Sequence, residues 1–311
     1  MTDVLAEQRE DAWRRATLRS MHHAADARPV DLRRVTPWWG RLLRQTAALI
    51  ALGFLAFVVV LSVAAPLVSP VDPNIQNLRN ILAPASPKAL LGTDDLGRDV
   101  LSRLIHGGRV SLLAVVQTVL IAVALGIPLG LVAGFVGGRT DRIIMTVNDA
   151  VMSFPALLLA IAVVAALGPS LTNAMFAVGL VFAPRLLRIA RGATLSVREE
   201  TFIEASRSLG ASPTFIVRRH VLRNIRSPLI VEVTLLAGRA MLAEASLSFL
   251  GLGAQYPDAS WGAMLGRSFG FIERAPLLLV YPGLAIALTV WALNSLGDSL
   301  RDVFGAEDRR G

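Results

Sequence analysis

EETFIEASRSLGASPTFIVRRHVLRN, residues 199–224, is a basic segment whose residue order predicts a helix, a sharp turn and a second helix. Helix-forming residues run up to Gly210, which can adopt the left-handed conformation that ends a helix. Ser212 can then cap a second helix, with Pro213 in its first turn. An ordinary loop lying on phospholipid headgroups would also explain the arginines. It explains the helix–glycine–helix order less well, so we predict a compact helical pair here.

Apolar stretches on both sides of this segment are long enough to cross about 30 Å of hydrocarbon. The chain of 311 residues is 54% hydrophobic and only 17% charged, which is typical of a membrane protein rather than a soluble domain. Six spans are predicted, at 46–68, 110–136, 143–167, 171–190, 228–250 and 276–296. We therefore expect an all-α polytopic membrane protein with both termini on one side.

The distribution of Arg and Lys sets the orientation in the membrane. The N-terminal tail 1–45 and the loop 191–227 are richer in Arg than the outer connections 69–109 and 251–275. These richer parts, together with the C-terminal tail 305–311, are expected to be cytoplasmic. The net charge of +8 lies between apolar spans, so membrane orientation explains it better than a nucleic-acid partner does.

Several catalytic signatures are missing from the sequence. There is no Cys, and the single lysine, Lys88, does not follow the glycine loop GxxxxGK[ST] that cradles a nucleotide phosphate. The four histidines form no HExxH pattern, so a zinc enzyme is disfavoured. We expect no catalytic residue, metal site or cofactor in this chain. Energy for any transport must come from another protein or from an ion gradient.

Polar residues within the predicted spans are candidates for lining a transport pathway. Charges at this depth are costly unless they are paired or hydrated. The candidates are Asn148, Asp149, Glu232, Arg239 and Glu244. Glu232 and Arg239 are two helical turns apart and share a face, so they can form either a structural ion pair or part of a hydrated pathway. Glu244 is expected near the outer membrane surface, at an outer gate or in solvent.

The second predicted span contains a run of small residues. Gly126, Gly130 and Gly134 recur every four residues, with Pro128 among them. Such spacing permits close approach of a neighbouring helix, or a kink.

The segment 199–224, called the coupling segment below, resembles the EAA loop of ABC importer permeases. Glu204-Ala205-Ser206 stands at the EAA position and Gly210 at the following glycine, whereas Ser206, His220 and Arg223 depart from the family pattern. Further blocks resemble the second, C-type permease of the dipeptide and oligopeptide subfamily. These blocks lie at 92–112, 247–265, 281–283 and 294–302. The resemblance covers about residues 46–304.

The resemblance implies a type I ABC importer permease fold in a bacterial inner membrane. It implies four kinds of partner: a homologous second permease in a heterodimer, two ATP-binding subunits that hold ATP and Mg, an extracytoplasmic solute-binding protein, and membrane lipid. The positions it assigns to ATPase coupling are Glu204, Ala205, Ser206, Leu209, Gly210, Ala211 and Phe215. Contact with the binding protein is expected at Asp94, Arg98 and Trp261.

Two other classes of function stay open on the sequence. A secondary transporter driven by an ion gradient would use Asp149 and the Glu232–Arg239 pair as a relay. A membrane scaffold would bind partners without moving solute. Within the importer reading, dipeptides or oligopeptides are the expected substrates, with nickel or another small solute as the alternative.

Overall fold

The computed structural model describes residues 38–308, and within that range the chain forms helices but no β-strand. The helices are α2 (Trp38–Leu42), α3 (Thr46–Val63), α4 (Ala65–Val68), α5 (Val100–Val136), α6 (Gly138–Met152), α7 (Ala156–Leu167), α8 (Leu171–Arg198), α9 (Thr201–Ser208), α10 (Pro213–Ile216), the π-helical turn η1 (Val217–Val221), α11 (Leu222–Phe249), α12 (Trp261–Phe269) and α13 (Leu277–Asp308). The all-α prediction is confirmed. Most of the predicted N-terminal tail and the end of the C-terminal tail lie outside the described residues.

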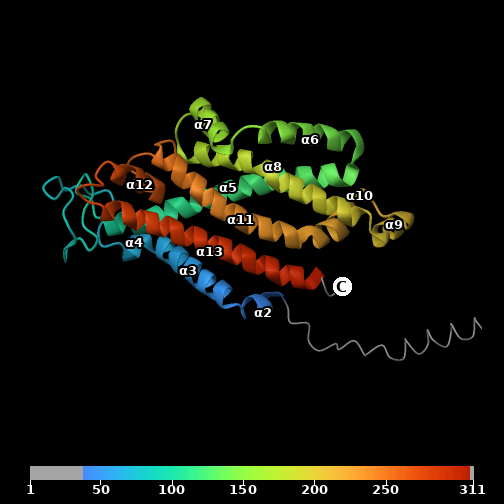
Figure 1. The fold of residues 1–311 in the computed structure, drawn as a ribbon, viewed down its shortest axis with the longest axis horizontal. Coiled ribbons are helices and arrows are strands. Elements are labelled where there is room, and N and C mark those ends of the chain that lie inside the picture. The colour runs from blue at the N-terminus through green and yellow to red at the C-terminus, as the bar shows by residue number, and fades with distance from the viewer. Residues whose placement is uncertain (1–37, 309–311) are drawn as a thin grey trace, which may run out of the picture. The chain divides into compact units, whose positions relative to one another are not determined.

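From Leu42 onward the long helices lie side by side (Figure 1). α5 packs along α8, α11 contacts both of them, and α13 packs between α11 and α3. α5 has 37 residues, or roughly 55 Å at 1.5 Å per residue. It is therefore longer than the bilayer is thick, and its first turns extend into the outer connection.

Glycines make the contact between α5 and α8 unusually close. A Cβ atom at Gly130 would lie 2.5 Å from the carbonyl oxygen of Leu187 and 2.6 Å from the Cβ of Ala190. Gly126 and Gly134 face α8 in the same way, because residues four apart share one side of a helix. The predicted close approach through small residues is confirmed.

By length and composition, fewer helices qualify as spans than the six expected. Among the residues that the structure describes, four helices are long and apolar enough to cross a membrane: α3, α5, α8 and α13. The pair α6 and α7 passes that test only when the two helices are taken together. α11 has the length, but its apolar part contains Glu232, Arg239 and Glu244, more charged side chains than this test allows in one span. Every predicted span thus contains a helix, while composition alone supports four or five spans.

The expected span at 143–167 is not one straight helix. α6 and α7 meet at an angle of 90°, across the break at Ser153, Phe154 and Pro155. Pro155 disfavours a helical conformation at the residue before it. The Ser153 hydroxyl donates to the carbonyl oxygen of Asp149 at 2.8 Å, which closes the last turn of α6. The predicted span ran through this proline because it followed the apolar run alone.

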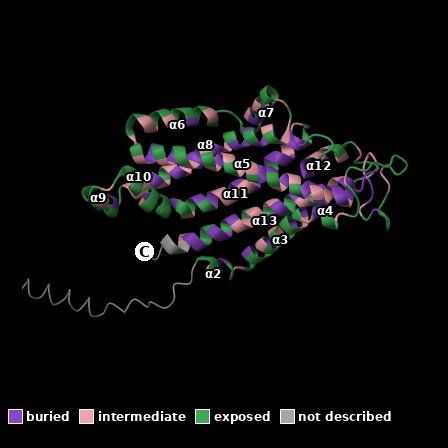
Figure 2. Cartoon of the chain, turned by 180° about the vertical axis from the view of Figure 1, so that it is seen from behind, coloured by how far each residue is buried: buried purple, intermediate pink, exposed green. Residues whose placement is uncertain are grey.

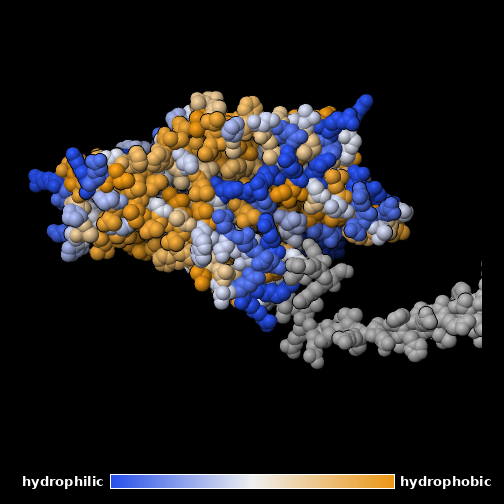
Figure 3. Space-filling model, viewed as in Figure 1, coloured by the Kyte–Doolittle hydropathy of each residue, from blue (hydrophilic) through white to orange (hydrophobic). Residues whose placement is uncertain are grey.

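The bundle interior is buried, whereas the surfaces of α6 and α9 and the broad hydrophobic areas of the bundle are exposed. Buried residues line the contacts between α5, α8, α11 and α13, whereas α6 and α9 are largely exposed (Figure 2). The space-filling view shows broad hydrophobic areas on the bundle (Figure 3). They include large side chains such as Ile50, Val60 and Leu113, each more than half exposed. Such a surface is suited to lipid or to apolar partner helices.

Candidate functional site

The coupling segment folds as a helix, a turn and a second helix. α9 ends at Ser208, and Gly210 takes a φ of +79°, the left-handed conformation expected of it. The Ser212 hydroxyl accepts a hydrogen bond from the backbone N–H of Phe215 at 3.3 Å. Pro213 occupies the first turn of α10. The local prediction is confirmed in each of these details.

The second helix of this pair does not end before the membrane. α10 passes through the π-helical turn η1 directly into α11, and the residues at both junctions have right-handed helical dihedrals. The loop expected at 191–227 is therefore shorter, because α8 continues to Arg198 and α11 begins at Leu222. A displacement of α10 would be transmitted along a continuous helix into the bundle.

Apolar side chains fix the coupling segment to the bundle. Ile203 of α9 and Ile216 of α10 are buried against Val221 and Ile225, in a cluster that also contains Leu186 of α8. Both short helices thus have a buried face on the same cluster. The segment is a packed projection on the end of the bundle, and α9 lies at its outer edge (Figure 1).

The opposite face of the coupling segment is exposed. Leu209 is 87% exposed and Phe215 is 51% exposed, although neither belongs to an apolar span. Glu204 and Ala205 are exposed beside them, and Ser206 and Ala211 are half-buried. Exposed large apolar side chains grouped outside the lipid-facing region are typical of a protein contact. The predicted coupling residues thus lie around one projecting turn.

Inside the bundle, one buried carboxylate is shared by two guanidinium groups. Glu232 of α11 accepts a hydrogen bond from Arg185 Nε of α8 at 2.9 Å and another from Arg239 Nη2. The side chain of Glu232 is 6% exposed and that of Arg239 is 30% exposed. The predicted pairing of Glu232 with Arg239 is confirmed, and Arg185 is an additional partner.

The remaining polar candidates on α6 differ in their surroundings. Asp149 is exposed and pairs with Arg188 of α8 at 2.8 Å. Asn148 is buried, and its Oδ1 atom has no hydrogen-bond partner among the described residues. Closer to the start of α6, Asp141 binds Arg191 at 2.5 Å and 2.7 Å. Ion pairs therefore hold α6 against α8.

Glu244 does not line a gate and is not solvated, contrary to expectation. It is fully buried, and its carboxylate accepts hydrogen bonds from Ser111 at 3.0 Å and from Ser248 at 2.7 Å. Ser111 also accepts from the backbone N–H of Trp261, and Ser248 from that of Ala254. Glu244 thus joins α5 and α11 to the loop before α12.

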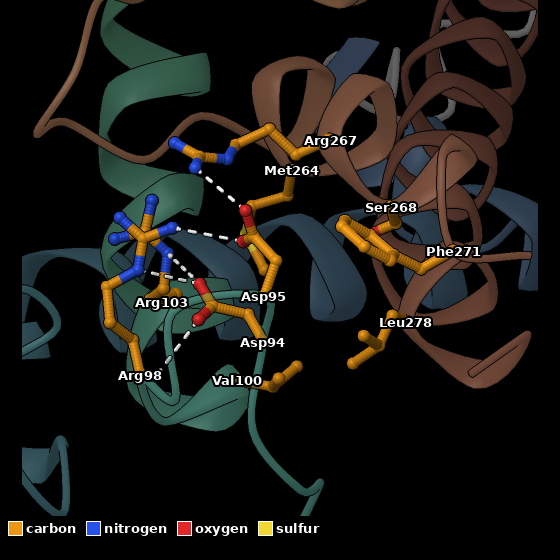
Figure 4. A pocket seen from close by; sticks show the side chains of 10 residues that line it. All are labelled: Asp94, Asp95, Arg98, Val100, Arg103, Met264, Arg267, Ser268, Phe271 and Leu278. Carbon is orange, nitrogen blue, oxygen red and sulfur yellow. Dashed lines mark hydrogen bonds and ion pairs between the residues drawn. The ribbon is translucent and has the colours of Figure 1, made fainter. Parts of the chain in front are cut away.

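An ionic cluster ties the outer connection to α12. Asp94 lies 2.7 Å from Arg98 Nε and 3.5 Å from Arg103 Nε. Asp95 binds Arg267 of α12 at 2.8 Å and lies 3.6 Å from Arg98 Nη2. Figure 4 shows the carboxylates of Asp94 and Asp95 facing the three guanidinium groups.

The expected contact of Arg98 and Trp261 with a binding protein is not supported by this geometry. Arg98 is 1% exposed and Trp261 is 4% exposed. The Trp261 indole donates to the Leu104 carbonyl oxygen at 2.8 Å, so this ring is used for packing against α5. Asp94 is partly exposed, but its carboxylate is already bonded to the backbone and the side chain of Arg98. All three residues stabilise the outer connection instead.

A family model described as the inner membrane component of binding-protein-dependent transport systems matches residues 126–307, more than half of the chain. The chain belongs to this family. As an ABC importer permease it is a bacterial inner-membrane component that works with separate ATPase and solute-binding subunits, and in this family ATP hydrolysis belongs to the ATPase subunits. A second model, the N-terminal TM domain of oligopeptide transport permease C, matches residues 36–85 of the permease.

Curated relatives of the permease are similar over most of their length. The di/tripeptide permease DppC of Pseudomonas aeruginosa is 41% identical, over 92% of this chain and 97% of its own. The glutathione permease GsiD of Pectobacterium atrosepticum is 42% identical, over 86% and 90%. The probable D,D-dipeptide permease DdpC of Escherichia coli is 40% identical, over 85% and 87%.

A solved structure supports the fold of the permease. The inward-facing MetNI methionine ABC transporter matches with a TM-score of 0.56, at 20% identity, over 65% of this chain and 97% of the matched one. The expected type I ABC importer permease fold is confirmed.

Sequence reasoning missed two residues of the permease that the structure places among its intramembrane charges. Arg185 and Arg188 fall inside the predicted span 171–190, where an ionised side chain is itself a signal of function. The sequence-based candidates included carboxylates and Arg239 but none of the arginines of that span. Both lie on α8 and pair with carboxylates of other helices.

Proposed function

We propose that the permease forms half of the translocation pathway of an importer for small peptides, beside a homologous second permease. The substrate class is supported by the relatives, whose names specify di- and tripeptides, glutathione and a D,D-dipeptide. The observation that carries the mechanism is the continuity of α10, η1 and α11. One helical rod joins the projecting turn to the buried carboxylate Glu232.

The proposed complex contains two ATP-binding subunits on the inner side, and these bind ATP and Mg. The coupling segment docks on one of them through Leu209, Phe215 and the residues around Glu204. A solute-binding protein delivers the peptide from outside. The N- and C-termini are cytoplasmic in this arrangement, on the side that carries the Arg-rich segments.

ATP acts on this permease by changing the relative stability of two states. Binding of ATP draws the ATPase subunits together, so the outward-facing state must be stabilised more than the inward-facing one. The motion enters through α9 and α10, which pack as one unit on α8 and α11. Hydrolysis then allows return to the inward-facing state and release of the peptide.

The proposal is tested by uptake of a labelled tripeptide into proteoliposomes that contain both permeases and both ATPase subunits, with the binding protein added outside. We expect uptake that requires internal ATP and that persists when a protonophore collapses the proton gradient. A substitution in the ATP site of the partner subunits should abolish it. Uptake that follows the ion gradient instead would favour a secondary transporter, and uptake of nickel without peptide would correct the substrate.

A further inference from the structure

The charges around Glu232 do not balance. Its single carboxylate faces two guanidinium groups, Arg185 and Arg239. Arg301 of α13 lines the next cavity together with Glu232. Arg239 Nε is buried without a hydrogen-bond partner among the described residues. An excess of positive charge at membrane depth is costly, so this site favours water or an anion beside Arg239.

The excess charge lies at the edge of an apolar cavity. Arg239 lines a cavity of about 220 Å³ between α7, α8 and α11. The other side chains that define it include Ala156, Ala160, Val178, Phe182, Leu242 and Ser246. Pockets that enclose a drug-sized ligand measure about 300–1,000 Å³. This cavity is smaller, so it suits one apolar side chain rather than a whole peptide.

The cavity lies part-way across the membrane. Arg239 is 17 residues from the start of α11, or roughly 25 Å along the helix. Arg185 is 14 residues from the opposite, outer end of α8, or roughly 21 Å. Hydrophilic side chains cross the bundle surface in the region of α8 and α11, between hydrophobic areas (Figure 3). A solute that moves along this face would meet the guanidinium group and the cavity together.

We propose that Arg239 and this cavity form a binding site for the C-terminal end of the substrate peptide, with the carboxylate on the guanidinium and the last side chain in the cavity. The proposal rests on the proposed peptide import. A free carboxylate is the anion that all small linear peptides share, so one such site serves peptides of different sequence. The carboxylate of Glu232 competes with the peptide carboxylate for Arg239, so the bound peptide can dissociate.

The test compares a tripeptide ending in Leu with its C-terminal amide, in ATP-driven uptake by the complete complex with the same saturated binding protein. Arg239→Gln is expected to lower uptake of the acid about tenfold, the value of one charge-assisted hydrogen bond, and to change uptake of the amide by less than about twofold. Arg239→Lys keeps the charge and should keep most of the preference for the acid. Preferences of the binding protein cancel when variant and wild type are compared.

A second variant tests the cavity without changing any charge. Ser246→Phe fills the cavity and should lower uptake of peptides ending in Leu more than of peptides ending in Gly. Thr234→Phe is the matched control, because Thr234 lies on the same helix outside the cavity and bonds to the carbonyl four residues back, as Ser246 does. It should not discriminate between the two peptides.

The outcomes separate this inference from the proposed function. A wild-type complex that imports no peptide contradicts the proposed function. If the wild type imports peptide and Arg239→Gln lowers acid and amide alike, or neither, the binding site is wrong while peptide import stands. If Arg239→Gln does not assemble, Ser246→Phe decides: equal effects on peptides ending in Leu and Gly overturn the site.

Discussion

At the scale of single residues, Glu244 shows how a buried carboxylate stabilises the end of the bundle next to α12. Two of its hydroxyl partners also accept backbone N–H groups: Ser111 accepts from Trp261 at the start of α12, and Ser248 accepts from Ala254 in the loop before α12. A buried donor left without an acceptor costs about 1–3 kcal/mol. The carboxylate therefore stabilises two hydroxyls at once, and through them the loop.

Glu244→Ala is expected to lower the thermal denaturation temperature of the purified complex, with a loss of roughly 2–4 kcal/mol, because both hydroxyls lose their acceptor. Glu244→Gln retains an acceptor oxygen and should cost less than half as much. Thermal unfolding monitored in detergent measures both. Equal stability of the alanine variant and the wild type would show that the hydroxyls find other acceptors, contrary to this network.

Predictions for single residues succeeded where the residue's own backbone preference determines its conformation. They failed where contacts with residues distant in sequence determine its burial. Gly210 could be placed from its own chemistry, since few other residues adopt a positive φ at a helix end. The burial of Glu244 and Trp261 could not be predicted, because it depends on serines and on glycines of α5 that are distant in sequence. In the sequence, a charged residue near the end of a span looks the same whether its side chain is solvated or buried in the fold.

At the scale of elements, the turn between α9 and α10 must hold its shape to transmit force. A Cβ atom at Gly210 would meet nothing within 4 Å, so any effect of a larger residue comes from the backbone alone. Gly210→Val forces a β-branched residue to φ of +79°, at a cost of about 2 kcal/mol. We expect normal membrane insertion but roughly fivefold fewer peptides imported per ATP hydrolysed.

Gly192→Val is the control for that measurement. Gly192 lies within α8, its added Cβ would also meet nothing within 4 Å, and its φ is not positive. Valine is tolerated in a helix at least as well as glycine. Normal coupling in Gly210→Val, or an equal loss in both variants, would contradict the role of this turn.

The contact between α5 and α8 is a second element-scale feature with a direct test. Gly130→Ala places a methyl group against the backbone of α8, and overpacking of this kind costs about 1–3 kcal/mol. Gly53→Ala in α3 meets nothing within 4 Å and should be neutral or slightly stabilising. Detergent-solubilised samples should therefore differ in denaturation temperature. A Gly130→Ala variant as stable as Gly53→Ala would mean that these helices do not pack so closely.

Helix positions could largely be predicted from apolar runs, whereas their continuity could not. The bend at Pro155 and the fusion of α10 with α11 both depend on local backbone geometry at residues that an apolar run passes over. The composition test also excludes α11, because its charged side chains are counted as if they faced lipid. The ion pairs on Glu232 show that charges of α11 face partners within the bundle rather than lipid.

At the scale of the whole molecule, the outer connection and the coupling segment form two different surfaces of the permease. In the outer connection, Asp94 and Asp95 form ion pairs with three arginines of the same chain. These pairs stabilise the connection without a partner protein. The coupling segment exposes Leu209 and Phe215 to solvent. In the proposed function the energy input enters at the coupling segment, and the identity of that partner comes from family resemblance rather than from residue chemistry.

The orientation of the coupling segment is tested most directly by a single cysteine in place of Leu209, since the chain contains no other. In the assembled complex, Leu209→Cys should crosslink to an ATP-binding subunit and resist a membrane-impermeant thiol reagent added outside. Leu90→Cys, at an exposed position in the outer connection, should react with that reagent and form no such crosslink. Labelling of the Leu209→Cys variant from outside, or its failure to crosslink in a complex that transports, would contradict the account.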